Sequence, residues 1–181
     1  PNGKIYFVPS DADNVGVFDP STDSFSVVPT TFSGVDKYLG GVLAPNGKIY
    51  FVPHAPGSVG VFDPSTNIFS VVDISSTGHD YQGGVLAPNG KIYFVPAKAD
   101  SVGVFDPSTD AFSVVDISGT ITGDYKYLGG VLAPNGKIYF VPSDADNVGV
   151  FTPGSAAPVY DVDGDIPLSW SALLGPRYNK Y

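Results

Sequence analysis

Acidic residues in one short, recurring segment are the first groups of this chain whose types and spacing could do chemistry. The segments SDADN, AKADS and SDADN place carboxylates after the same apolar sequence each time. Clustered carboxylates suit a hard cation such as Ca²⁺, which takes about six to eight oxygen ligands. A solvated acidic loop at a strand end explains the same pattern, and we expect this simpler interpretation. The residues are Asp11, Asp13, Asp100, Asp144 and Asp146.

A second acidic sequence, DVDGD, contains Asp161, Asp163 and Asp165 as weaker metal candidates. A calcium loop of the EF-hand type needs Gly at its sixth position and Glu at its twelfth. Ile166 and Ala172 stand at those positions. The sequence therefore predicts a turn there rather than a metal site.

The two histidines, His54 and His79, both fall in links between strand-like segments. His79 precedes Asp80, and a histidine beside an acid can serve as a general base with its orienting group. Hydrolase chemistry also needs a nucleophile, and the chain has no Cys and no Gly-x-Ser-x-Gly sequence. We therefore expect exposed loop histidines, and count His54 and the nearby loop residue Lys98 as candidate binding residues.

Aromatic residues gather where one recurring strand-like segment begins. They are Tyr38, Tyr81, Tyr125 and Tyr127, with Lys37 and Lys126 beside them. Tyrosine is enriched at binding surfaces, so these residues predict a rim that holds a partner protein or a glycan. The alternative is that the rings pack inside the protein.

A repeated sequence supplies the elements that must position these residues. PNGKIYFVP occurs four times, beginning at Pro1, Pro45, Pro88 and Pro134, so successive copies are 44, 43 and 46 residues apart. That period, with strand-forming residues, is typical of a β-propeller blade. We predict one all-β propeller domain over residues 1–181, with units 1–44, 45–87, 88–133 and 134–176 and a degenerate C-terminal tail at 152–181.

Each unit contains four strand-like pieces: A (YLGGVLA type), B (KIYFVP), C (VGVF) and D (FSVV). Asn-Gly predicts a hairpin between A and B, and Asp-Pro-Ser-Thr predicts a type I turn between C and D. All variation in length falls in the D–A link. In a four-stranded antiparallel blade the B–C and D–A links share one face, which we call the variable face. Any site is expected there.

The end of the chain bears on how the array is completed. Trp170–Pro176 resembles Leu128–Pro134 and predicts a fifth copy of piece A. Pairing of Leu168–Gly175 beside Lys4–Val8 would join the terminal strands and close a ring of four blades, each with four antiparallel strands. The alternative is a fragment of a larger propeller.

Composition limits the classes of partner that the chain can bind. The net charge of -9 argues against nucleic acid, which needs a basic footprint. No stretch approaches the ~20 apolar residues of a membrane-spanning helix, so we expect no membrane insertion. The chain lacks Met and begins inside a repeat. We therefore expect a piece of a longer precursor, and a secreted or organelle-lumen location.

The repeat resembles known propeller families over Pro1–Phe151. VGVFDPST followed by FSVV resembles the Kelch motif, with Phe in place of its aromatic residues. GGVLAPNGKIYFVP is similar to segments of NHL-like and lactonase-like propellers, and most similar to repetitive propeller-like proteins of unicellular algae. These resemblances imply a propeller. The lactonase-like one also implies a central metal held by residues of several blades.

The similarity between units informs the prediction of function. Pro1–Phe18 and Pro134–Phe151 are identical, and blades this alike have had little divergence in which to build a catalytic site. We therefore expect a non-enzymatic binding propeller without a cofactor, acting as a protein-interaction scaffold or as an accessory subunit of a larger assembly. The alternatives are a metal-dependent enzyme of the lactonase or lyase kind and an acidic surface protein that binds calcium or glycans.

Overall fold

The computed structural model describes residues 2–55, 57–74 and 80–154, which form fourteen strands and no helix. Apolar residues in short runs, separated by Gly, Pro and Asp turns, favour strands of this length. The strands are β1 (Ile5–Phe7), β2 (Asn14–Asp19), β3 (Ser24–Pro29), β4 (Tyr38–Leu43), β5 (Ile49–Pro53), β6 (Ser58–Asp63), β7 (Ile68–Asp73), β8 (Tyr81–Leu86), β9 (Ile92–Pro96), β10 (Ser101–Asp106), β11 (Ala111–Asp116), β12 (Tyr127–Leu132), β13 (Ile138–Pro142) and β14 (Gly149–Phe151).

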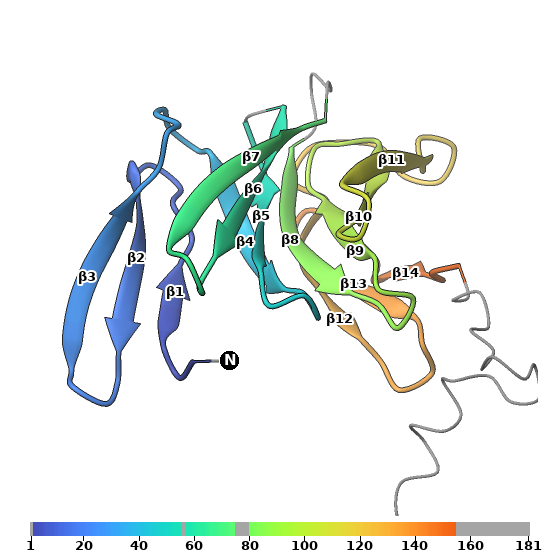
Figure 1. Cartoon of the computed structure of the whole chain (residues 1–181). Helices are drawn as coiled ribbons and strands as arrows, with labels where there is room; N and C mark the ends of the chain where they lie inside the picture. Colours follow the sequence, from blue (N-terminus) through green and yellow to red (C-terminus); the bar gives the residue numbers. More distant parts are fainter. Residues whose placement is uncertain (1, 56, 75–79, 155–181) are drawn as a thin grey trace, which may run out of the picture.

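The strands form four antiparallel sheets, which we call blades 1 to 4. Blade 1 is β1-β2-β3, blade 2 is β4-β5-β6-β7, blade 3 is β8-β9-β10-β11 and blade 4 is β12-β13-β14. The chain runs from the outer strand of one blade to the inner strand of the next, and the blades stand side by side (Figure 1). The predicted order A-B-C-D is confirmed. Among the described residues, blade 1 lacks an inner strand and blade 4 lacks an outer one.

The inner strands β4, β8 and β12 lie against one another, and their glycines allow the close approach. A Cβ added to Gly40 would lie 2.8 Å from the Cα of Gly83, and one added to Gly83 would lie 3.3 Å from the Cα of Gly129. Gly40 also has φ +119°, which side chains rarely tolerate. The Gly-Gly doublets therefore set the spacing of neighbouring blades at their inner edge.

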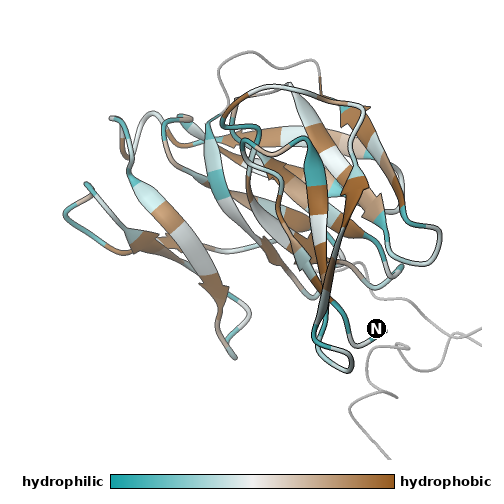
Figure 2. Ribbon diagram, turned by 90° about the vertical axis from the view of Figure 1, so that its left-hand side faces the viewer, coloured by the Kyte–Doolittle hydropathy of each residue, from teal (hydrophilic) through white to brown (hydrophobic). Residues whose placement is uncertain are grey.

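The core lies between successive blades, because the strands place apolar side chains on both faces of a sheet. Figure 2 shows apolar residues along the strands. Valines on one face of a blade, which we call its Val face, pack against the next blade. The surface that they meet there carries aromatic and isoleucine side chains, and we call it the Phe face of that next blade. Between blades 2 and 3, the Val face is Val42, Val52, Val59 and Val61, and the Phe face is Tyr81, Ile92, Phe94 and Phe105. This pattern explains why pieces B and C are almost continuously apolar.

The turns follow the predicted chemistry, with one addition. Asn-Gly forms the A–B hairpin through a loop of three residues, in which Gly47 has φ +81° and its N–H donates to the carbonyl of Ala44. The Asp63 carboxylate accepts from the Ser65 N–H and hydroxyl at 2.8 and 2.6 Å, as expected of an Asp-Pro-Ser-Thr turn. The addition is a residue with positive φ just before the outer strand, here Asn67 at φ 55°.

The predicted closure of the ring involves Leu168–Gly175, which lie outside the described residues, as does most of the C-terminal tail at 152–181. Within the described part, no neighbouring blade covers the Phe face of blade 1 or the Val face of blade 4, and both are exposed. The described strands therefore form an open array of propeller-like blades.

Candidate binding site on the variable face

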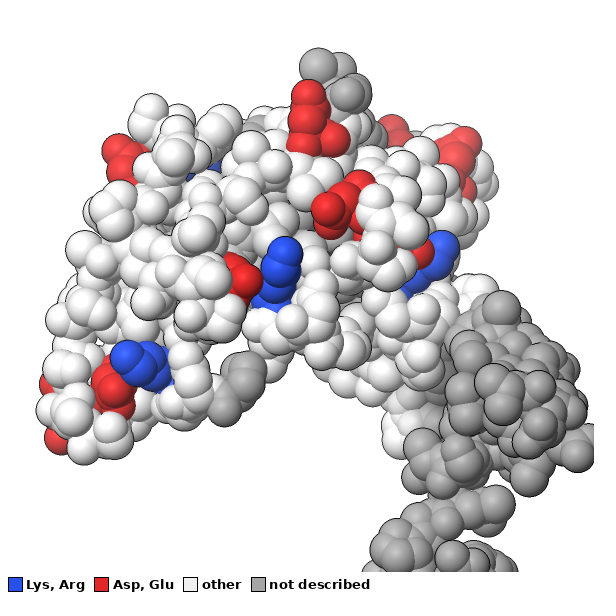
Figure 3. Space-filling view, viewed as in Figure 1, with Lys and Arg blue, Asp and Glu red and all other residues white. Residues whose placement is uncertain are grey.

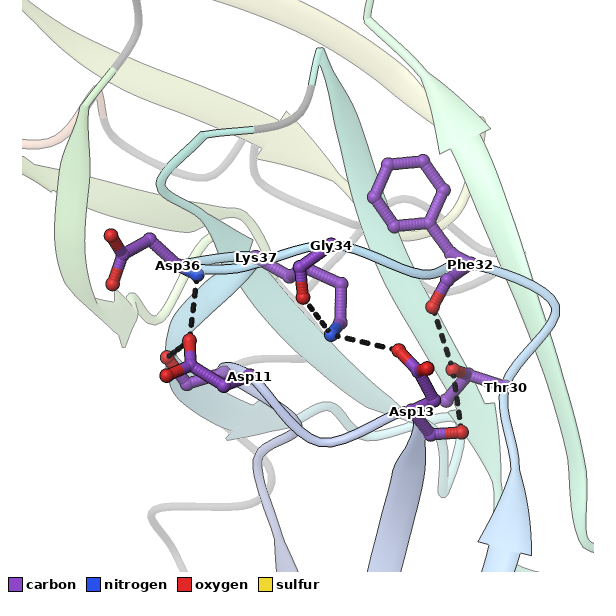
Figure 4. Close-up of polar contacts among 8 residues, drawn as sticks. Asp11, Asp13, Thr30, Phe32, Gly34, Asp36 and Lys37 are labelled. Atoms are coloured by element: carbon purple, nitrogen blue, oxygen red, sulfur yellow. Dashed lines mark hydrogen bonds and ion pairs between the residues drawn. The ribbon is translucent and has the colours of Figure 1, made fainter.

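A buried lysine links neighbouring blades on the variable face. Lys37, just before β4, is 1% exposed, and its Nζ lies 3.3 Å from a carboxylate oxygen of Asp13 in the preceding blade (Figure 4). The same Nζ donates to the carbonyl of Gly34 at 2.7 Å. Two residues before Asp13 in the same loop, the Asp11 carboxylate accepts from the Asp36 N–H at 2.8 Å. Polar groups of two blades are thus joined in one network.

The link between blades 3 and 4 repeats this arrangement. Lys126 is 2% exposed, and its Nζ lies 3.5 Å from Asp100. It also donates to the carbonyls of Gly123 and Lys98 at 2.7 and 3.1 Å. Lys37 and Lys126 therefore do not stand on an exposed rim. The carboxylates of Asp13 and Asp100 are ion-paired and do not cluster with each other.

The junction between blades 2 and 3 is built differently. Gly57 occupies the loop position of Asp13 and Asp100, and Asp80 occupies the position of the buried lysine. Both members of the pair have thus changed together. The sequence contains this signal, since aligning the repeats shows the double change, but the pairing itself was not predicted.

Asp80 is the centre of a new polar cluster at this junction. Its carboxylate lies 3.5 Å from Lys98 Nζ and 4.0 Å from His54 Nδ1. Lys98 Nζ also lies 4.8 Å from the centre of the Tyr125 ring, within reach of a cation–π interaction. We call His54, Asp80, Lys98 and Tyr125 the junction cluster. It combines an aromatic surface, a cation, an anion and an imidazole from three blades.

The electrostatics of the cluster follow from these contacts. Tyr125 chiefly, and then the negative charge of Asp80, raise the pKa of Lys98, so the ammonium form is stabilised. His54 Nδ1 is buried and has no hydrogen-bond partner in the protein. The histidine next to Asp80 in sequence, His79, lies outside the described residues. The histidine described beside the Asp80 carboxylate is His54 of the preceding blade.

Three of the four predicted rim tyrosines are corrected by the structure. Tyr38, Tyr81 and Tyr127 are buried among the strands, because their rings pack on the Phe face of their own blade. The Tyr81 hydroxyl lies 3.1 Å from that of Ser101, and burial raises the pKa of Tyr81 to about 12. Tyr125 alone of the four is exposed, at 44%.

The remaining candidates do not assemble into a metal centre within the described ranges. Asp144 accepts from the hydroxyl of Ser143, and Asp146 is exposed. No three His, Cys, Asp or Glu groups come together there closely enough to hold an ion. Asp161, Asp163 and Asp165 lie outside the described part of the chain.

Acidic groups are distributed along the variable face. Figure 3 shows acidic side chains at several points along the upper edge of the molecule, where the links of the variable face lie. The opposite face carries ion pairs between turns of one blade, such as Lys4 with Asp19 at 3.6 Å. In the described part of the chain, no helix is long and apolar enough to span a membrane.

Comparison with solved structures shows the fold. No protein-family model and no curated protein matches the sequence. A streptogramin B lyase matches with a TM-score of 0.71 and 17% identity, over 83% of this chain and 48% of the lyase. Virginiamycin B lyase from Staphylococcus aureus, in an inactive variant with quinupristin, matches with a TM-score of 0.69 and 13% identity, over 90% and 50%.

Binding proteins share the same architecture. An auxiliary nutrient binding protein from Bacteroides thetaiotaomicron matches with a TM-score of 0.60 and 15% identity, over 85% of this chain and 39% of that protein. The chain is therefore a β-propeller-like repeat protein. It spans about half the length of the lyases that it resembles.

Proposed function

We propose that this chain is a non-enzymatic binding propeller that holds a partner protein at the junction cluster, as an accessory subunit of a larger assembly. The observation that carries the proposal is the change at one blade junction. The other two described junctions use a buried lysine and an aspartate, whereas this one has Asp80 and Gly57. In an array of near-identical blades, the junction that departs from the pattern is the natural place for a specific function.

The exposed groups of the cluster define the partner chemistry. Tyr125 offers an accessible ring, and Lys98 offers an ammonium group whose side chain is 34% exposed. Tyrosine rings and partly shielded charges are frequent energetic centres of protein interfaces. A partner surface with a carboxylate for Lys98 and an apolar or aromatic group for Tyr125 would complement the cluster.

The neighbours support binding as a use of this architecture. Auxiliary nutrient binding proteins share the fold, and another similar structure is an extracellular domain of a hybrid two-component system. A secreted or lumenal location would accord with those proteins. The lyases share the fold, but their sequence identity to this chain, 17% and 13%, is too low to infer a shared chemistry. A lyase-like activity would depend on His54 of the same cluster.

Native purification of the protein from its source tests the proposal. We expect the chain to elute in a defined complex, with a partner identified by mass spectrometry. The variant Lys98→Asp with Tyr125→Ala, expressed in the source, should lose that partner. Residue 98 then carries the aspartate found at the corresponding positions 11 and 144, so the substitution suits the loop.

The matched control is Asp11→Ala with Asp36→Ala, which alters the corresponding loop and link of the first junction. Retention of the partner by the Lys98/Tyr125 variant, or loss in both variants alike, would refute a role for the junction cluster. Recovery of a bound glycan or small molecule in place of a protein would refute the protein partner. Turnover of a bound compound that His54→Ala abolishes would refute the non-enzymatic function.

A further inference from the structure

The first blade exposes a face whose counterparts in the other blades are buried or half-buried. Ile5, Phe7 and Phe25 form the Phe face of blade 1 and are 50%, 50% and 63% exposed. The matching phenylalanines of blade 2, Phe51 and Phe69, are 0% and 7% exposed. The difference arises because the Val face of a preceding blade covers the Phe face at each internal junction but not here.

The last blade exposes the other half of the same interface. Its Val face carries four valines that are 49–60% exposed, whereas their counterparts in blade 3 are at most 8% exposed. The exposed set is Val131, Val141, Val148 and Val150, and the buried counterparts are Val85, Val95, Val102 and Val104. Two complementary apolar surfaces thus lie at opposite ends of one array, and a monomeric protein rarely leaves such surfaces exposed.

We propose that a second copy of this chain covers both ends, so that the Val face of blade 4 in each copy packs on the Phe face of blade 1 in the other. The contact is head-to-tail, since each copy offers two different surfaces. Its residues are those of the internal junctions, because the unit is repeated almost unchanged. The shape match that packs blade 3 on blade 2 therefore applies between copies.

A hollow beside β1 shows that blade 1 is also open at its inner edge. It measures about 290 Å³ and is lined by Lys4, Tyr6, Val8, Gly41 and Leu43, with Ile49 and Phe51. At the next junction the corresponding place is filled, because Val42 of the inner strand and Val52 both lie within 3.0 Å of a Cβ added to Gly84. At Gly41 only Val8 takes such a position. Among the described residues, no strand takes the inner place of blade 1.

The size of the similar propellers favours two copies over closure within one chain. The four blades superpose on about half of the lyase structures, so their curvature suits an array about twice as long. Two copies provide that length, and closing the array removes both exposed ends. A ring closed by one copy would need the outward faces of blades 1 and 4 to meet.

Light scattering coupled to size-exclusion chromatography tests the proposal on the 181-residue chain. We expect a particle with twice the 18.9 kDa mass of one copy. Val141→Asp on the Val face and Phe25→Asp on the Phe face should each give single copies, since every contact uses one face of each kind. Val114→Asp is the control, because Val114 is 48% exposed on an outer strand away from both end faces.

Mixing the two blocked variants gives the sharpest result. The intact Phe face of Val141→Asp can still bind the intact Val face of Phe25→Asp, so we expect a dimer containing one of each. A dimer that survives in either variant alone would refute the head-to-tail contact. A wild-type chain that stays at 18.9 kDa, or that grows into species larger than two copies, would refute the two-copy ring.

Discussion

At the scale of the residue, two of the three described blade junctions depend on a lysine buried beside the inner strand. Lys37 and Lys126 are among the most buried side chains described; each lies near one aspartate, and they donate to one and two backbone carbonyls respectively. A buried ammonium group is tolerated only when its donors are satisfied, so these contacts are structural necessities. In the middle junction Asp80 occupies the corresponding position, so that junction has no buried lysine there.

Replacing a buried lysine should weaken the array. Lys126→Met removes two donors to carbonyls and the partner of Asp100, and we expect the free energy of unfolding to fall by about 1–3 kcal/mol. Asp100 is 55% exposed and can be solvated, which limits the loss. Chemical denaturation measures the change. Lys137→Met, at an exposed position, is the control and should have little effect.

The lysine–aspartate pair of the other two junctions should be restorable at the middle junction when both positions are changed together. Asp80→Lys alone places a lysine where no aspartate stands opposite, and we expect a loss of about 1–3 kcal/mol. Adding Gly57→Asp restores the pairing seen in the neighbouring junctions and should recover most of that stability. A double-mutant cycle by chemical denaturation gives the coupling energy. A coupling energy near zero would show that the two positions do not act together.

At the scale of the element, the outer hairpin of a blade is held by an aspartate in its turn. Hydrogen bonds from Ser65, through its hydroxyl and its N–H, lower the pKa of Asp63, and Ser21 and Ser108 do the same for Asp19 and Asp106. A carboxylate whose pKa is lower in the folded state stabilises the fold above its unfolded value of about 3.8, and that contribution disappears as the pH falls through the folded pKa.

The turns should therefore make the protein sensitive to acid below about pH 4. Asp63→Asn keeps an oxygen acceptor but removes the charge. We expect it to lower the melting temperature at neutral pH and to make the fall on acidification shallower. Thermal unfolding followed by circular dichroism across this range measures both effects. Asp124→Asn, an exposed position outside these turns, corrects for net charge, and an equal change in slope there would contradict the prediction.

The inner strands should tolerate no side chain at their contact points. Gly40→Ala places a Cβ 2.8 Å from the backbone of Gly83 at a φ of +119°, so we expect a loss of roughly 2–4 kcal/mol. Gly129 occupies the matching position in β12, and nothing lies within 4 Å of a Cβ added there. In the Val141→Asp background, which we expect to remain a single copy, Gly129→Ala should therefore change stability by less than about 1 kcal/mol. Equal losses in both variants would contradict this account of blade spacing.

At the scale of the whole molecule, the array behaves as a row of units in which each blade contacts its neighbours. Blades 2 and 3 have four strands and both faces covered, whereas blades 1 and 4 have three described strands and one exposed face. In such arrays stability is close to a sum of unit and junction contributions. The terminal blades of a single copy are therefore the weakest units.

Hydrogen exchange should reveal this gradient. In dilute Val141→Asp, which we expect to remain a single copy, amides of β1 and β14 should exchange roughly 10- to 100-fold faster than those of β5 and β9. Wild-type protein at high concentration should protect the terminal blades, because the second copy covers them. Uniform protection along the array of the blocked variant would contradict the independence of the blades.

Much of the architecture could be predicted from the sequence because repetition multiplies weak signals. Asn-Gly hairpins, Asp-Pro-Ser-Thr turns and apolar pieces recur in register, so four antiparallel sheets and their strand order were predicted and are confirmed, with three described strands instead of four in blades 1 and 4. The tyrosines could be either binding residues or packed rings by sequence, because a local sequence cannot show which side of an inner strand faces the next blade. The contact between Asp80 and His54 was missed for a related reason, since the two residues are 26 positions apart in sequence.

The local geometry can be derived from the sequence alone: strand lengths, turns, and the glycines where backbones must approach. These features depend on neighbouring residues, whose preferences act within a few positions. The pairing of charges, the burial of the tyrosines and the two uncovered faces became known from the three-dimensional packing. Those outcomes depend on contacts between blades more than twenty residues apart in the chain, where the distance in space is set by the packing of whole sheets.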